Sequence, residues 1–321
     1  MSLLPPLDKL KIPIIGSPLF IISNPDLVIA QCKAGVIGSF PCLNAREGEG
    51  EPNMLEIWLN KINEELDKYN QENPDNPAAP YAVNHIVHKS NVRLQQDIDI
   101  CAKWKAPVWI TSLGARPEVN EVAHQANGIV LHDIINNFFA KKAIEKGADG
   151  LVAVAAGAGG HAGTLSPFAL IQEIREWFDG PLLLSGSIAN GGAVLAAQAM
   201  GADLAYIGSA FIATNEANAD QRYKEMITES SADDIVYTNL FTGVHGNYLK
   251  GSIEAQGLDP NNLEVSDSSK MNFSSGASKP KSWKEIWGSG QGISAVKSIL
   301  PASDLVKRIN DEYIKAKKEL V

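Results

Sequence analysis

Paired cysteines, long apolar runs and clusters of basic residues are all scarce in this 321-residue sequence. Lys and Arg total 28 against 37 Asp and Glu, so the formal net charge is −9, and basic residues gather only sparsely, at 307–318. This acidic balance argues against nucleic acid or an anionic membrane surface as a partner. The longest apolar stretches fall far short of the roughly 18 residues that span a bilayer, and the N-terminus shows no secretion signal. We therefore expect a cytoplasmic protein that binds neither nucleic acid nor membranes.

The three cysteines are Cys32, Cys42 and Cys101, an odd number with no C-x-x-C spacing and no histidine nearby in the sequence. This pattern favours reduced, mostly buried thiols over a redox or metal role. His85 and His88, three apart on an expected strand, would point to opposite faces and make a poor metal pair. No metal site is therefore predicted.

Short apolar runs rich in Val and Ile alternate along the chain with longer segments of helical periodicity. Such alternation is typical of parallel strands that are buried on both faces and joined by crossover helices. Eight β/α units in about 230 residues fit a closed barrel, whereas a doubly wound open sheet more often has five or six strands. The predicted strands are 12–16, 36–40, 81–87, 107–112, 128–131, 150–156, 181–185 and 204–208.

The predicted fold is therefore an α/β (β/α)8 TIM barrel with a C-terminal cap or lid and a closing helix. The barrel is expected at 1–231, with an inserted helix at 46–80. A cap or substrate region is expected at 232–290, and a C-terminal helix that packs on the barrel at 291–321. Length alone also allows two domains, but the part after the barrel has too little apolar periodicity to form an independent one.

In such a barrel the active site lies at the C-terminal ends of the strands. No lysine ends a predicted strand, which argues against Schiff-base chemistry, and Asp133 is the only carboxylate there. One carboxylate builds neither a glycosidase pair nor a multi-carboxylate magnesium site. Instead, Ser185-Gly186-Ser187 follows the seventh strand and Gly208-Ser209 the eighth. Barrels commonly bind phosphate at these two loops through backbone N–H groups, although the glycines could also merely relieve crowding at the turns.

The glycine-rich segment 155–163 contains His161 and formally satisfies the dinucleotide fingerprint G-x-G-x-x-A. A Rossmann domain also needs an acidic residue at the end of the next strand. Asp179 has the right spacing but precedes strand 181–185, at its wrong end, so this alternative is disfavoured. We interpret His161 as a base on a loop that a flat cofactor or substrate can approach.

These motifs resemble the nitronate monooxygenase family, formerly called 2-nitropropane dioxygenases, which are FMN-containing barrels. The resemblance covers roughly 12–216 and returns weakly at 290–292. Its most specific part is Ala-Gly-Gly-His-Ala-Gly at 158–163. The segment 201–217 is similar to the family's eighth strand and its continuation, with Ser209 in place of threonine.

The resemblance implies that His161 is the catalytic base, which removes the α-proton of a nitroalkane or lies over the bound nitronate. It also implies that the loops after the seventh and eighth strands bind the FMN phosphate, that Gly159 and Gly160 line the flavin, and that Asn84 hydrogen-bonds near its ring. The implied cofactor site is Pro18, Leu19, Phe20, Asn84, Asp133, Ala158, Gly159, Gly160, Ser185, Gly186, Ser187, Gly208, Ser209 and Gln291.

Three departures from the family pattern bear on this site. Leu19 and Phe20 replace the usual small residue and methionine of the first-strand loop. The segment 185–188 reads Ser-Gly-Ser-Ile where Ala-Gly-Gly-Ile is usual, and a serine hydroxyl can still bind phosphate. The segment 241–249 lacks the arginine of a Thr-Gly-Arg stretch, which bears on the substrate rather than on the cofactor.

The implied reaction is FMN-dependent oxidation of a nitronate or nitroalkane by dioxygen to a carbonyl compound and nitrite. Two alternatives stay open. The same scaffold serves FMN-dependent NAD(P)H oxidoreductases that reduce quinones or enoyl thioesters. Phosphate loops alone would also suit a flavin-free barrel that binds a phosphate ligand. The expected partners are a small-molecule substrate and dioxygen, with NAD(P)H in the first alternative, and the sequence is compatible with a homodimer.

Overall fold

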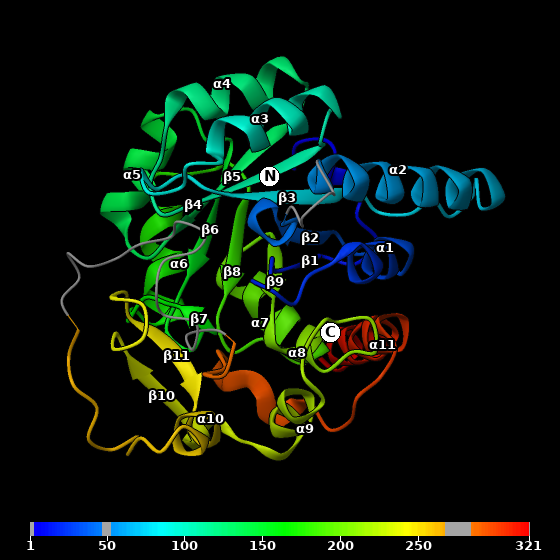
Figure 1. Cartoon of the computed structure of the whole chain (residues 1–321). Helices are drawn as coiled ribbons and strands as arrows, with labels where there is room; N and C mark the ends of the chain where they lie inside the picture. The colour runs from blue at the N-terminus through cyan, green and yellow to red at the C-terminus, as the bar shows by residue number, and fades with distance from the viewer. Residues whose placement is uncertain (1–2, 47–52, 267–283, 321) are drawn as a thin grey trace.

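The computed structural model of the chain describes residues 3–46, 53–266 and 284–320. Eight parallel strands form the central sheet in the order β1-β9-β8-β6-β5-β4-β3-β2 (Figure 1). The two ends of that order also meet, because Gly16 N donates to Ile37 O over 2.7 Å and Ile15 pairs with Ile37. The sheet therefore closes into a barrel. Its strands are β1 (Ile14–Gly16), β2 (Gly38–Pro41), β3 (Tyr81–Ile86), β4 (Val108–Ser112), β5 (Ile129–Ile134), β6 (Gly150–Val154), β8 (Leu182–Ser185) and β9 (Leu204–Ile207).

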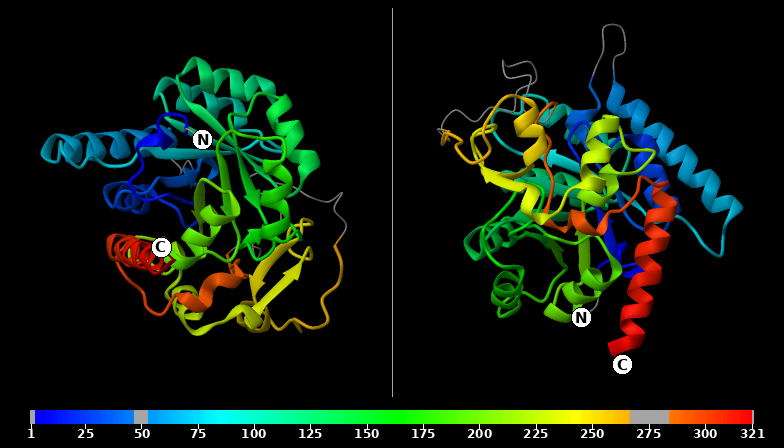
Figure 2. Two further views of the ribbon diagram at one scale, coloured as in Figure 1. Left: turned by 180° about the vertical axis from the view of Figure 1, so that it is seen from behind. Right: turned by 90° about the horizontal axis from the view of Figure 1, so that it is seen from below.

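Helices surround the barrel (Figures 1 and 2). Strand residues bury one face against these helices, as Trp109 does, and the other face inside the barrel, as Ile110 does. Burial on both faces explains why the strand sequences are apolar throughout. The helices are α1 (Pro25–Lys33), α2 (Met54–Glu72), α3 (Leu94–Lys103), α4 (Pro117–Gln125), α5 (Asn137–Glu145), α6 (Pro167–Arg175), α7 (Gly191–Met200), α8 (Ser209–Ile212) and α9 (Gln221–Glu229).

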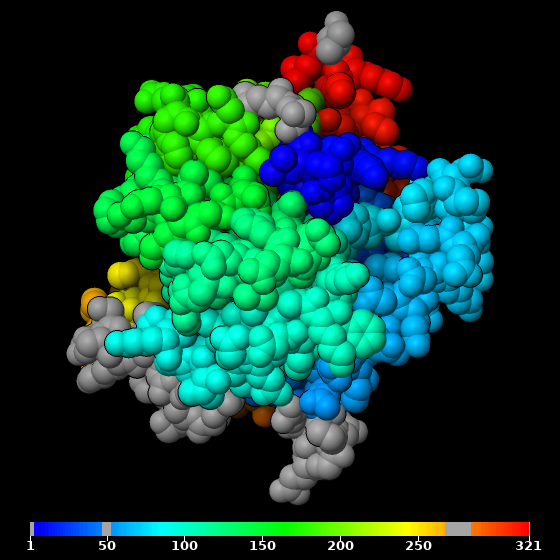
Figure 3. Space-filling view, turned by 90° about the horizontal axis from the view of Figure 1, so that it is seen from above, coloured from blue at the N-terminus to red at the C-terminus, as the bar shows by residue number. Residues whose placement is uncertain are grey.

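The N-terminal segment lies against one end of the barrel. Leu7, in the 3-10 helix η1 (Leu7–Lys9), is fully buried among the side chains of the barrel interior. In the space-filling view this segment, in dark blue, lies between the red C-terminal helix and the light blue residues of α2 (Figure 3). This arrangement leaves the opposite end of the barrel for the functional site.

All eight predicted strands are present, so the TIM-barrel prediction is confirmed. The predicted closing helix is α11 (Ala302–Leu320), which the 3-10 helix η5 (Gln291–Ala295) precedes. It packs on α7, where Glu312 Oε2 accepts from Gly191 N over 2.9 Å. A Cβ at position 191 would collide with the backbone of Tyr313, so only glycine permits this approach.

A second, three-stranded sheet is not predicted by the sequence. Its order is β10-β11-β7, with β10 (Ile235–Thr238) and β11 (Gly246–Leu249) from the cap and β7 (Gly160–His161) from a barrel loop. The helix α10 (Lys250–Ala255) follows β11, and the cap elements lie together at one end of the barrel (Figure 1). The sheet joins the cap directly to the loop that carries His161.

The division of the chain at residues 231 and 290 stays a prediction. Two parts of the predicted segments, 47–52 in the inserted helix and 267–283 in the cap, lie outside the described residues. Within the described ranges, no helix combines the length and the apolar character needed to cross a membrane.

Candidate active site

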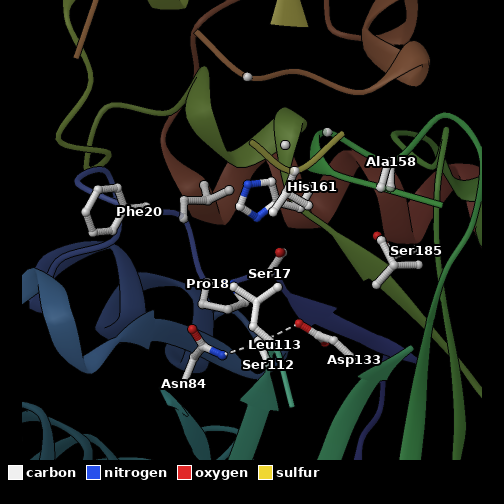
Figure 4. Close-up of a pocket in the computed structure, with 18 of the residues that line it drawn as sticks. Ser17, Pro18, Phe20, Asn84, Ser112, Leu113, Asp133, Ala158, His161 and Ser185 are labelled. Atoms are coloured by element: carbon white, nitrogen blue, oxygen red, sulfur yellow. Dashed lines mark hydrogen bonds between the residues drawn. The ribbon is translucent and has the colours of Figure 1, made fainter. Parts of the chain in front are cut away.

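A large pocket opens at the C-terminal ends of the barrel strands (Figure 4). Its volume is about 1590 Å³, above the ~300–1,000 Å³ typical of small-molecule sites, so a cofactor and a substrate fit together. Gln291 does not line it, although its neighbours Gly290 and Gly292 do. The other predicted site residues all line the pocket: Pro18, Leu19, Phe20, Asn84, Asp133, Ala158, Gly159, Gly160, His161, Ser185, Gly186, Ser187, Gly208 and Ser209.

The loops after β8 and β9, the seventh and eighth barrel strands, form one end of this pocket. Gly186 has a φ of 138° and Ser187 a φ of 57°, in the left-handed region that strains a residue with a side chain. After β9, Gly208 leads directly into the short helix α8. In TIM barrels, these two loops and the N-terminus of a short extra helix commonly form a phosphate site.

The segment 290–291 is hydrogen-bonded to the loop after β9 and to the loop after β6. Gly290 N donates to Ser209 Oγ over 2.8 Å, and Gln291 N donates to Gly157 O over 2.9 Å. A Cβ on Gly159 would lie 2.7 Å from Gly290 N, so the contact requires glycine. Because Ser209 Oγ accepts from Gly290, its own hydroxyl proton can be donated to an anion.

Asn84, Ser112 and Asp133 form a chain of hydrogen bonds across the pocket from His161 (Figure 4). Asn84 Nδ2 donates to Ile110 O over 3.1 Å and to Ser112 Oγ over 2.9 Å. Ser112 Oγ in turn donates to Asp133 Oδ2 over 2.5 Å. Since both amide hydrogens of Asn84 are used, its side-chain oxygen is the atom that can meet a bound ring.

Asp133 is the only acid among the described residues that line the pocket. Burial raises the pKa of its carboxyl to about 6, against the lowering effect of the Ser112 hydrogen bond. Two of the basic side chains that line the pocket are paired with acids outside it, Arg93 with Asp97 and Lys142 with Glu145, and the other three still outnumber Asp133, in contrast to the net charge of −9 of the chain. Such a surplus favours anionic ligands. The basic side chains that line it are Arg46, Arg93, Lys142, Lys146 and Lys284.

His161 reaches the pocket from β7, and the cap holds this strand on both sides. β11 pairs antiparallel with both residues of β7. Before His161, Asn247 Nδ2 donates to Ala158 O over 2.6 Å; after it, Tyr237 OH donates to Ala162 O over 3.0 Å. Despite its glycines, the loop is therefore anchored at several points.

The side chain of His161 is oriented by Thr242 of the cap. His161 Nε2 lies 3.0 Å from Thr242 Oγ1, and Thr242 Oγ1 donates to Val244 O over 3.0 Å. Because the hydroxyl proton goes to Val244, Oγ1 accepts from Nε2–H, and the lone pair of the neutral ring is on Nδ1. Burial lowers the pKa of His161 to about 4, so the ring is neutral at pH 7. The neutral form is the one that a general base requires.

The loop after β1 forms a further wall of the pocket. Asn44 holds this loop, accepting from Ile21 N over 2.9 Å and donating to Leu19 O over 3.0 Å. The guanidinium of Arg46 lies 5.4 Å from the centroid of the Phe20 ring, a cation–π arrangement. Sequence reasoning missed Arg46, which belongs to no motif. It noted the segment that contains Thr242 only for its missing arginine, and Thr242 is 81 residues from His161.

The family model for nitronate monooxygenase matches residues 2–312, and the chain belongs to this family. The protein is therefore a flavin-dependent oxidoreductase, and the resemblance seen in the sequence is confirmed. A nitronate monooxygenase of Paraburkholderia phytofirmans is 25% identical over 98% of this chain and 96% of its own length. A probable nitronate monooxygenase of Staphylococcus haemolyticus is 23% identical over 70% of this chain and 66% of its own length.

Two solved structures resemble the whole chain in fold. A nitroalkane oxidase from Streptomyces ansochromogenes has a TM-score of 0.80 at 21% identity, over 98% of this chain and 99% of that one. FabK from Thermotoga maritima has a TM-score of 0.76 at 20% identity, over 97% of this chain and 96% of that one. At these identities the likeness shows the fold alone.

Proposed function

We propose that the protein oxidises nitronates and nitroalkanes with FMN and dioxygen to a carbonyl compound and nitrite, with His161 as the catalytic base. The observation that carries this proposal is the position of His161. A neutral imidazole, oriented by Thr242, faces a pocket whose end has the loops of a phosphate site. The cytoplasm is the proposed location, since the three cysteines are free and buried.

FMN fits the residues that are present. Its single phosphate matches the cradle formed by Gly186, Ser187, Gly208 and Ser209, whose backbone N–H groups can bind an anion. The backbone of Gly159 and Gly160 would line the ring, which leaves room because neither residue has a side chain. Asn84 would offer its amide oxygen to a ring N–H, since its amide hydrogens are used by Ile110 and Ser112.

When bound, FMN would supply the electron transfer from substrate to dioxygen. The chain's own residues would bind, orient and deprotonate the substrate. For a neutral nitroalkane, Nδ1 of His161 would take the α-proton, and Thr242 would keep Nε2 protonated throughout. For a nitronate, which has already lost that proton, His161 would only position the anion, and the basic pocket lining would attract it.

An anaerobic mixing experiment tests the proposal. The purified protein should be yellow, with flavin absorbance at about 450 nm. Denaturation should release the bound flavin as FMN. Addition of nitronate without oxygen should change the flavin spectrum, and oxygen should then restore it with release of nitrite. If nitronate has no effect while NADH or NADPH reduces the flavin rapidly, the NAD(P)H oxidoreductase alternative is correct instead. Protein that binds no flavin, even with added FMN, would exclude both.

A further inference from the structure

Two cysteines and a histidine meet outside the pocket, between the barrel wall and α3. Cys42 lies in the 3-10 helix η2 (Cys42–Asn44), His85 in β3 and Cys101 in α3. The two Sγ atoms are 3.7 Å apart, and Cys42 Sγ lies 4.0 Å from His85 Nε2. All three ligand atoms lie within 4.8 Å of one another. None of these residues lines the pocket, and each is at most 1% exposed.

Two of these three distances are close to the edges of a metal coordination shell, and the third, between Cys101 and His85, is at most 4.8 Å. An ion that binds sulfur at about 2.3 Å and imidazole nitrogen at about 2.0–2.1 Å, with angles of about 110–120°, separates two sulfurs by roughly 3.8–4.0 Å and a sulfur from the nitrogen by roughly 3.6–3.8 Å. The observed 3.7 and 4.0 Å lie within a few tenths of these values. A disulfide would require the sulfurs to approach to about 2.05 Å. An ion therefore needs less movement of the side chains than a disulfide does.

The third cysteine shows what a buried thiol without a ligand role looks like in this protein. Cys32 Sγ donates to Pro80 O over 3.4 Å and accepts from Gly38 N over 3.4 Å. Among the described residues, the thiols of Cys42 and Cys101 hydrogen-bond instead only to each other and to His85. Nδ1 of His85 is buried and has no hydrogen-bond partner in the described part of the chain. The backbone therefore does not provide hydrogen bonds to the thiols of Cys42 and Cys101 as it does to the thiol of Cys32.

Charge also favours an ion over ionised thiols alone. Two thiolates and a neutral imidazole together carry two negative charges, which a cation would offset while displacing the thiol protons. Sulfur and imidazole donors select soft ions with a filled d shell rather than Mg²⁺ or Ca²⁺.

We propose that Cys42, His85 and Cys101 form a structural site for a thiophilic metal ion, Zn²⁺ or Cu⁺. Each of the three ligands is at most 1% exposed, which leaves no open position for a substrate, so the site is structural rather than catalytic. Because the site is closed, the ion would enter during folding. The bound ion would tie η2 to β3 and α3. Asn44, at the end of η2, holds the Pro18–Phe20 wall of the pocket, so the ion would stabilise that wall indirectly.

Metal analysis of the flavin-loaded protein tests this proposal. The wild-type chain should be produced in media supplemented with zinc or with copper, purified without metal-affinity steps, and analysed by elemental mass spectrometry. We expect about one ion per chain from one of the two media, and the medium that gives it identifies the ion. X-ray absorption at the metal edge should show two sulfur neighbours and imidazole nitrogen. Wild-type protein that carries neither ion would overturn the proposal without any variant.

Variants distinguish this site from adventitious binding. Cys42→Ser and Cys101→Ser should each lose the ion, whereas the matched control Cys32→Ser, at an equally buried thiol, should keep it. Wild-type protein produced in metal-depleted medium should also have a lower melting temperature than metal-loaded wild-type protein. This measurement does not depend on whether the variants fold. Metal retained by both Cys42→Ser and Cys101→Ser, or bound only through oxygen and nitrogen, would show that the thiol contact is incidental.

Discussion

Nε2 of His161 lies 3.0 Å from Oγ1 of Thr242, and this contact joins the barrel to the cap. His161 belongs to the loop after β6, whereas Thr242 lies between β10 and β11. The cap therefore orients the proposed base in addition to covering the pocket.

Removing the hydroxyl of Thr242 should impair proton abstraction without impairing flavin binding. We expect Thr242→Ala to lower kcat/KM for a neutral nitroalkane about tenfold, because a lost hydrogen bond of ~1–1.5 kcal/mol corresponds to roughly that factor. Thr242→Ser keeps the hydroxyl and should restore most of the rate. Turnover of a preformed nitronate, which needs no base, should change little. Equal losses on both substrates would assign Thr242 a merely structural role.

Removing the imidazole itself should have a larger effect on the same substrate. His161→Ala should retain FMN, because the phosphate loops lie elsewhere, but should lose roughly 10²–10⁴-fold in activity toward neutral nitroalkanes. The measurement is steady-state nitrite release together with the flavin-to-protein absorbance ratio. Unchanged nitroalkane turnover with full flavin content would refute the role of His161 as base.

Activity toward a neutral nitroalkane should be lost on acidification only at an unusually low pH. Burial lowers the pKa of His161 to about 4, below the ~6.5 of an unperturbed histidine. The ring of His161 therefore stays neutral as the pH falls below 7, and becomes protonated only when the pH approaches this lowered pKa. We expect kcat/KM for a neutral nitroalkane to remain flat from pH 7 down to about pH 5. Because the pKa of Asp133 in the same pocket is about 6, the profile should also be measured for Asp133→Asn. A loss of activity centred near pH 6.5 that persists in this variant would mean that the ring of His161 is not desolvated in the working enzyme.

Strain and hydrogen bonding at Ser187 can be separated by two substitutions. The residue has a φ of 57°, which costs a residue with a side chain about 1 kcal/mol or more relative to glycine. Ser187→Gly and Ser187→Ala both lose the hydroxyl and should weaken FMN binding similarly. Only the glycine variant relieves the strain, so its unfolding free energy in denaturant should exceed that of the alanine variant by about 1 kcal/mol. Identical stabilities would show that the loop relaxes.

The sequence predicts the barrel well because each strand is a short apolar run that is buried on both faces. It also identifies the pocket, since residues that end parallel strands must meet at one end of a barrel. It does not predict β7, whose two residues, Gly160 and His161, are too few to show an alternating pattern. Contacts between residues that are far apart in the sequence are equally difficult to predict. The pairs His161 with Thr242 and Cys42 with Cys101 are 81 and 59 residues apart, and no local pattern marks them.

The local charge of the pocket is a further property that composition does not reveal. A chain of net charge −9 suggests that an anionic phosphate is held against an unfavourable field. Folding gathers five basic side chains and one acid at the pocket instead. Arg46 and Lys284, for example, are separated by most of the chain and both line it. The electrostatic field that acts on a ligand depends on this local arrangement of charges rather than on the net charge of the chain.

The pairing of β7 with β11 offers the sharpest test of how the cap controls His161. Gly246 lies opposite His161, and a Cβ at position 246 would lie 2.7 Å from Gly160 O. Since that neighbour is backbone, Gly246→Ala must push the two strands apart and shift the imidazole. We expect FMN to remain bound, nitroalkane turnover to fall at least tenfold, and nitronate turnover to be largely preserved.

The matched control is Gly251→Ala, in α10 of the same cap. A Cβ there would meet only the flexible side chain of Met226, and alanine favours a helix over glycine. This variant should keep wild-type rates on both substrates. If Gly246→Ala behaves like Gly251→Ala, the cap does not position the base, and the orientation of His161 must come from the barrel loop alone. If both variants lose flavin, the substitutions act through global stability instead, which a denaturant titration of each variant would reveal.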